Sequence, residues 1–161
     1  FRLVQADGAD FYNVMLRHIF ATPKDLDQLL ADPYCSVESD GVVTATEGLL
    51  SNFTMNRSSF GYTIRFIEEY VINRGMFTLE EGIRKMTSLP AESAGLLNRG
   101  RIESGKTADL VILDQNKLAD NSTDREPNAY PSGVDLVIVN GQVVLNKNER
   151  TDILPGRIAT H

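Results

Sequence analysis

The sequence holds few of the side chains that bind transition metals. It has two histidines, His18 and His161, near opposite ends of the chain, and one cysteine, Cys35. Each isolated histidine is expected to be a surface or hydrogen-bonded residue rather than a metal ligand. A single cysteine cannot form an internal disulfide, so nothing indicates an oxidising compartment, and we expect a cytoplasmic location.

Two further absences restrict the partners of the chain. No apolar run approaches the ~20 residues that cross a bilayer. The net charge of -6 argues against nucleic acid and anionic membranes, because both would repel the chain. The sequence also begins at Phe1 without a methionine and shows no signal peptide. We therefore expect a truncated or processed chain whose natural start lies upstream.

The first part of the chain alternates short apolar runs with turns. The hydrophobic share of 42% and charged share of 24% are those of a soluble globular domain. Residues 12–20 are interpreted as a strand, and residues 22–32, which open with Thr-Pro, predict a capped helix. Residues 34–39 predict a buried strand that ends at Asp-Gly. Residues 42–60 lack a clean period and are expected to form a long loop.

Helices are expected next along the chain. Apolar spacing predicts a helix over 63–74, with a glycine as its stop. Another helix starts at Thr78, where Glu81 three residues later completes a capping box. A third, short helix is expected over 90–95. The character of the sequence then changes from helical to β near residue 100.

The last part of the chain predicts a small β module. Residues 108–113 read as a strand, and residues 114–133, rich in Asn, Asp and Pro, as a loop. Two further strands, 136–139 and 142–145, flank Asn140-Gly141. Asn-Gly is the strongest short signal for a hairpin, because both residues tolerate the positive φ of a type I′ turn.

Asp40 is the main candidate for chemistry. It follows the predicted strand and precedes a glycine and the long loop. In α/β barrels the catalytic residues lie at the C-terminal ends of strands, where a carboxylate can ligate a metal or take a proton from water. Aspartate also caps turns before glycine very often, and spacing alone favours that simpler role. Glu38 shares a face with Asp40 on strand alternation, but a polar filler or rim residue is the better interpretation.

Several motifs follow Ser-Asp-Gly in a fixed order. They are RKMTSLPA over 84–91, GRIESGKTADLVILD over 100–114, YPSG over 130–133, VNGQVV over 139–144 and LPGR over 154–157. Together they resemble the end of the amidohydrolase superfamily. In detail they look like its D-aminoacylase (N-acyl-D-amino-acid deacylase) branch, and the stretch FGYTIRF is similar to a segment of the same branch.

The resemblance implies a fold and an activity. The fold would be α/β, with residues 1–100 as the C-terminal end of a (β/α)8 barrel and residues 101–161 as strands of a small composite β-sandwich. The activity would be zinc-dependent hydrolysis of a C–N bond, with deacylation of an N-acyl-D-amino acid as the expected reaction. Asp40 would correspond to the aspartate that binds the metal and passes a proton from the attacking water to the leaving amine.

The chain also departs from the family pattern. The family's His-x-His pair and its other ligand histidines belong to segments absent from this sequence, so Asp40 is the one plausible ligand. A catalytic zinc needs about three protein ligands, and we expect this chain alone to be inactive and to bind no stoichiometric zinc. The branch often carries His-Pro-Arg where this chain reads Met-Asn-Arg. Arg57 there is the candidate for a substrate carboxylate, with a solvated loop arginine as the simpler interpretation. Cys35 is interpreted as a small buried residue.

Two alternatives to a deacylase are open. Another amidohydrolase, such as a cyclic-amide hydrolase, would share these motifs. A catalytically silent binding or scaffold domain would keep the fold without the metal. The expected partners are a small-molecule N-acyl amino acid and, because the last strands of a barrel expose apolar edges, a second copy of the chain or an N-terminal partner chain.

Overall fold

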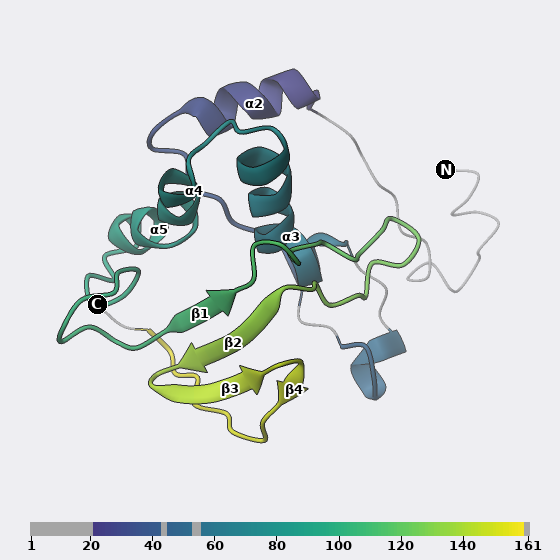
Figure 1. The fold of residues 1–161 in the computed structure, drawn as a ribbon, viewed down its shortest axis with the longest axis vertical. Helices are drawn as coiled ribbons and strands as arrows, with labels where there is room; N and C mark the ends of the chain where they lie inside the picture. The colour runs from purple at the N-terminus through teal and green to yellow at the C-terminus, as the bar shows by residue number, and fades with distance from the viewer. Residues whose placement is uncertain (1–20, 43–44, 53–55, 160–161) are drawn as a thin grey trace, which may run out of the picture. The chain divides into compact units, whose positions relative to one another are not determined.

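The computed structural model describes residues 21–42, 45–52 and 56–159. The chain divides into two compact units, residues 1–33 and residues 34–161. Among the described elements, helix α2 belongs to the first unit and every other helix and strand to the second (Figure 1). The strand predicted over 12–20 lies outside the described residues.

Helix α2, Pro23–Ala31, begins as the sequence predicts. Thr22 Oγ1 accepts a hydrogen bond from Asp25 N at 3.3 Å, and the Asp25 carboxylate accepts one from Thr22 N at 2.8 Å. This capping box satisfies two backbone donors, and Pro23 stands in the first turn, where no N–H is needed. Hydrogen bonds from the side chain and backbone of Thr22 lower the pKa of Asp25.

The main helical region of the second unit begins earlier in the sequence than predicted. Helix α3 spans Ser58–Phe66 and runs directly into a π-helical segment, η3, over Ile67–Asn73. The predicted helix over 63–74 is therefore right in type, but it begins at Ser58, inside the predicted loop. Arg57 at the N-cap makes no capping bond with its side chain, but Asn56 Oδ1 accepts from Ser58 N at 3.1 Å. A short 3-10 helix, η2 over Leu49–Asn52, also lies in the predicted loop.

Two further helices complete the helical part of this unit. Helix α4 spans Leu79–Met86, and Thr78 Oγ1 accepts from Glu81 N at 3.3 Å, which confirms Thr78 as the N-cap. The Glu81 carboxylate accepts from Arg84 at 2.7 Å instead of completing the predicted capping box. Helix α5 spans Ser88–Ser93. The apolar core of this unit lies in α3, η3 and α5; its buried members are Ile64, Phe66, Ile67, Val71 and Leu89.

An antiparallel sheet follows the helices. Its four strands lie side by side in chain order (Figure 1); they are β1 Leu110–Leu113, β2 Val134–Val139, β3 Gln142–Asn146 and β4 Glu149–Arg150. Asn140 and Gly141 have φ of 47° and 78°, so the predicted hairpin turn is confirmed. Strand β4 was not predicted, because the turn before it, Lys147-Asn148, lacks the glycine that marks such turns.

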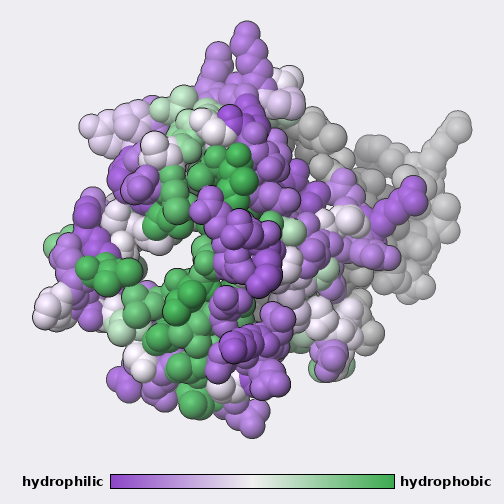
Figure 2. Space-filling view, viewed as in Figure 1, coloured by the Kyte–Doolittle hydropathy of each residue, from purple (hydrophilic) through white to green (hydrophobic). Residues whose placement is uncertain are grey.

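The sheet buries little of its apolar surface. None of the described strand residues is fully buried, and Val111 and Ile112 on β1 are each more than half exposed. On the face seen in Figure 2, apolar side chains gather over the strands. A sheet with this composition normally packs one face against another layer.

The strand predicted over 34–39 is wrong. Residues 35–40 have no regular secondary structure, and no described strand lies beside them. Val37 N instead donates to Lys85 O in helix α4 at 2.9 Å. A β-rich composition favours a strand only where a neighbouring backbone can pair with it. The described residues thus form a mixed α/β structure, and none of their helices is long and apolar enough to cross a membrane.

Candidate active site

Asp40 lies on an exposed segment that passes close to the start of helix α3. A Cβ placed on Gly41 would lie 3.2 Å from Ser59 Cα and 3.3 Å from Ser58 O. Val42 N also donates to Ser59 Oγ at 3.1 Å. Glycine at position 41 therefore permits a close approach that a larger residue would obstruct. The Asp40 segment is anchored against the first turn of α3.

Arg57 precedes that same turn and is partly buried. Its Nη2 donates to Asp120 Oδ2 at 2.7 Å, with 25% of the Arg57 side chain and 3% of the Asp120 side chain exposed. The interpretation of Arg57 as a solvated loop arginine does not fit these contacts. Because Val42 is hydrogen-bonded to Ser59 and a Cβ on Gly41 would lie against Ser58, the structure brings together the segments that carry Asp40 and Arg57.

Asp120 connects the loop before β2 to the helices. Its Oδ1 accepts from Ser122 Oγ at 2.6 Å and from Ser122 N at 3.0 Å, and its own N donates to Glu68 at 2.9 Å. Burial alone would raise the pKa of Asp120, but the hydrogen bonds from Ser122 and Arg57 outweigh it and lower that pKa. The carboxylate is therefore ionised at neutral pH and holds the Arg57 guanidinium in place.

Sequence reasoning did not identify Asp120. It lies in the Asn- and Asp-rich loop, and its partner Arg57 is 63 residues away in the sequence. The other sequence candidates contribute less. Glu38 is exposed, and Cys35 is half-buried rather than buried, with Sγ 3.6 Å from Ser36 O. His18 and His161 lie outside the described residues.

The described residues do not fit a catalytic zinc on their own. Within these ranges, no group of three or more His, Cys, Asp or Glu side chains is placed to hold a metal ion. A catalytic zinc takes about three protein ligands. Asp40 is thus available as one ligand, without a set around it in this part of the chain.

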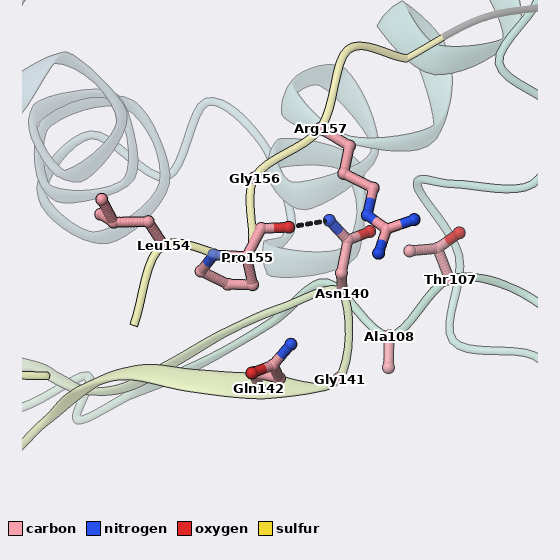
Figure 3. A pocket seen from close by; sticks show the side chains of 9 residues that line it. All are labelled: Thr107, Ala108, Asn140, Gly141, Gln142, Leu154, Pro155, Gly156 and Arg157. Carbon is pink, nitrogen blue, oxygen red and sulfur yellow. Dashed lines mark hydrogen bonds between the residues drawn. The ribbon is translucent and has the colours of Figure 1, made fainter. Parts of the chain in front are cut away.

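Three of the sequence motifs meet at a groove beside the hairpin turn. The groove has a volume of about 500 Å³, and Figure 3 shows its lining: Thr107, Ala108, Asn140, Gly141, Gln142, Leu154, Pro155, Gly156 and Arg157. Asn140 Nδ2 donates to Pro155 O at 2.7 Å, and Gly141 N donates to Ala108 O at 2.9 Å. These bonds tie the LPGR segment and the GKTADL segment to the turn.

Asp109, just before β1, connects that strand to the hairpin turn. Asp109 Oδ1 accepts from Asn140 N at 2.8 Å, and Oδ2 pairs with Arg99. Arg99 Nη2 also donates to Asn140 Oδ1 at 3.1 Å. The polar residues of these motifs therefore act mainly as structural links around the groove.

Comparison with known proteins gives consistent matches. Residues 25–145 match the model of the amidohydrolase family. The N-acyl-D-glutamate deacylase of Alcaligenes xylosoxydans xylosoxydans is 33% identical over 116 residues, which are 72% of this chain and 24% of that protein.

Two solved structures have the same fold over most of the chain. One, from a study of the binuclear metal centre in D-aminoacylase, has a TM-score of 0.72 at 30% identity and covers 82% of this chain and 26% of its own. The other is the N-acyl-D-glutamate deacylase of Bordetella bronchiseptica with zinc and a phosphonate inhibitor; its TM-score is 0.66 at 32% identity, over 75% of this chain and 24% of its own. This chain spans about a quarter of the length of these relatives. The resemblance found in the sequence motifs is confirmed, and the chain belongs to the amidohydrolase family.

Proposed function

We propose that the protein containing this chain hydrolyses the amide bond of N-acyl-D-amino acids. The observation that carries this proposal is the match, in both sequence and fold, to deacylases of N-acyl-D-amino acids over about three quarters of the chain. The matched family region includes both Asp40 and Arg57.

Asp40 is proposed to move the proton in this reaction. Amide hydrolysis needs a base for the attacking water and an acid for the leaving nitrogen, and one carboxylate serves both steps in turn. The exposure of Asp40 supports this role, because a substrate can approach its carboxylate.

Arg57 is proposed to bind the carboxylate of the substrate, which belongs to its amino-acid part. A guanidinium fork matches a carboxylate, and a quarter of the Arg57 side chain stays exposed beside its ion pair with Asp120. The adjacency of the Asp40 and Arg57 segments supports a single site in which one residue faces the reacting amide and the other faces the substrate carboxylate.

The whole protein is proposed to be a zinc enzyme, as the Bordetella relative is complexed with zinc. The residues described for this chain do not make a zinc site without further ligands. We therefore expect metal analysis of the purified 161-residue chain to find no stoichiometric zinc. One tightly bound zinc per chain would contradict that expectation and would point to a ligand set outside the described residues.

The finer fold is also a proposal. Residues 1–100 would be the end of a (β/α)8 barrel and residues 101–161 strands of a composite β-sandwich. The order of elements supports this, because the described helices all end by Ser93 and the strands begin at Leu110. The open sheet supports it too, since its exposed apolar residues need a covering layer from the rest of the protein, a second copy or a partner chain.

A substrate panel tests the proposed activity. The full-length protein, supplied with zinc, is assayed on N-acetyl-D-amino acids, on their L-enantiomers and on cyclic amides. We expect turnover of the D-compounds. The panel includes N-acetyl-D-glutamate, because two of the relatives are N-acyl-D-glutamate deacylases. Turnover of cyclic amides alone would favour the other amidohydrolase, and a folded, zinc-loaded protein inactive on all three classes would favour a silent scaffold.

A further inference from the structure

Lys85 is fully buried, with 1% of the residue exposed. It belongs to the RKMTSLPA motif and lies in the last turn of helix α4. Burying an ammonium group costs several kcal/mol unless specific bonds offset the loss of water. Methionine, of similar length and without a charge, would fill the same space without this cost. The presence of lysine at this position therefore calls for an explanation in its contacts.

Both ends of Lys85 contact the same short segment. The Nζ donates to Cys35 O at 3.1 Å, and the backbone O accepts from Val37 N at 2.9 Å. The ammonium also lies 3.9 Å from Glu81 Oε1 and 5.4 Å from the centre of the Phe77 ring. Any residue would supply the bond to Val37, but only a long donor side chain supplies the bond to Cys35.

This segment leads directly to Asp40. Residues 35–37 are fixed to α4 by Lys85, and Val42 is fixed to the first turn of α3 by Ser59. Asp40 thus lies between two anchor points, on a stretch that has no regular secondary structure of its own. In such a stretch the position of a side chain depends on its anchors rather than on strand neighbours.

We propose that Lys85 is a positioning residue: its ammonium group fixes the Cys35 carbonyl and thereby sets where the Asp40 carboxylate lies relative to the substrate amide. This inference rests on the proposed role of Asp40. A displacement of about 1 Å in a catalytic group can cost on the order of 10²-fold in rate. Among the contacts that hold this segment, the bond from Nζ to Cys35 O depends on the lysine side chain.

The first test uses Lys85→Met in the full-length protein. It removes the donor and retains the apolar volume, and we expect kcat to fall about 10- to 100-fold while KM changes by less than about threefold, because substrate contacts are unaltered. Faster hydrogen exchange of the Val37 amide should accompany the loss. Lys85→Arg, which keeps a cationic donor, should recover most of kcat. If Lys85→Met does not fold, Lys85→Gln takes its place.

Lys106 provides the matched control. Its Nζ also donates to a backbone carbonyl, Leu97 O, at 2.8 Å, but in the loop before β1. Lys106→Met should leave kcat within about twofold of the wild-type value, because that carbonyl does not lie on the Asp40 segment. An equal loss of kcat in both methionine variants would mean a general structural effect and would overturn the proposal.

A double variant separates this inference from the proposed function. If Lys85 acts through Asp40, then adding Lys85→Met to Asp40→Asn should cause little further loss of kcat, since the two effects are not additive. Full additivity, or a normal kcat in Lys85→Met beside a damaged Asp40→Asn, would overturn the role of Lys85 alone. A normal kcat in Asp40→Asn would overturn the role of Asp40 and, with it, the positioning role.

Discussion

The helices and the sheet of residues 34–161 differ in how they bury apolar side chains. The helices α3, η3 and α5 hold five buried aliphatic or aromatic residues, whereas the described strands hold none. The Phe66 ring lies 5.6 Å from the Tyr70 ring and 5.9 Å from the Phe77 ring between centroids. The helical part thus has a core of its own, and the sheet offers apolar surface that another layer would cover. Truncations in the two regions should differ accordingly.

The largest effect is expected in the helical core. Phe66→Ala should lower the free energy of unfolding by about 3–5 kcal/mol, because it leaves a cavity among packed rings. Val137→Ala on half-buried β2 is the control and should cost about 1 kcal/mol. Both free energies are measured by denaturant unfolding, in variants whose unfolding free energy depends on denaturant concentration with the same slope. Equal losses would mean that the sheet is already covered and that the contrast between the regions is wrong.

The Arg57–Asp120 ion pair should come next in size. Asp120→Asn leaves a partly buried guanidinium without its counter-charge and should cost about 2–3 kcal/mol, less than the ~3–5 kcal/mol of a fully buried pair because Arg57 is a quarter exposed. Glu92→Gln is the control, because it weakens the exposed Arg101–Glu92 pair, and its cost should be far smaller than that of Asp120→Asn. A similar cost for both variants would contradict the importance of burial.

The same pair predicts a pH dependence. The pKa of Asp120 is lowered in the folded state, so its contribution to stability is present above the unfolded pKa of about 4 and is lost as the pH falls through the folded value. Unfolding measured between pH 7 and pH 3 should therefore show a steeper acid loss in the wild type than in Asp120→Asn. Parallel curves would mean that Asp120 has a similar pKa in both states.

Features set by neighbouring residues were predictable from the sequence. The caps at Thr22 and Thr78 and the Asn140-Gly141 turn each depend on side chains and dihedral angles within four residues, and all three are confirmed. The order of the motifs likewise indicated the family, because motifs can be recognised in the sequence without knowing how the chain folds.

Features set by distant residues were not predictable. Residues 34–39 have a strand-like composition but pair with the end of α4 through Lys85, and no pattern in either segment indicates the other. The residues of the candidate site divide in the same way into those visible in the sequence and those revealed by the fold. Asp40 and Arg57 were identified from motifs, whereas Asp120 became visible only through the fold.

A smaller effect is expected at the hairpin turn. Asn140→Ala removes the bonds to Pro155 O and from Arg99 and places alanine at a φ of 47°, and it should cost about 2 kcal/mol. Asn148→Ala is the control, because Asn148 has a φ of 70° but no side-chain hydrogen bond described for it, and it should cost about 1 kcal/mol. Equal costs, measured by thermal unfolding, would assign the whole effect to backbone conformation.

The most direct test of the account is the replacement of Asp40 in the full-length protein. Asp40→Asn keeps the size of the side chain and removes the basic oxygen, so kcat on N-acyl-D-amino acids should fall by about 10²–10⁴-fold with little change in stability or KM. Glu38→Gln, on a neighbouring exposed carboxylate, should leave kcat nearly unchanged. Near-normal turnover by Asp40→Asn, or an equal loss in Glu38→Gln, would contradict the assignment of Asp40 as the group that moves the proton.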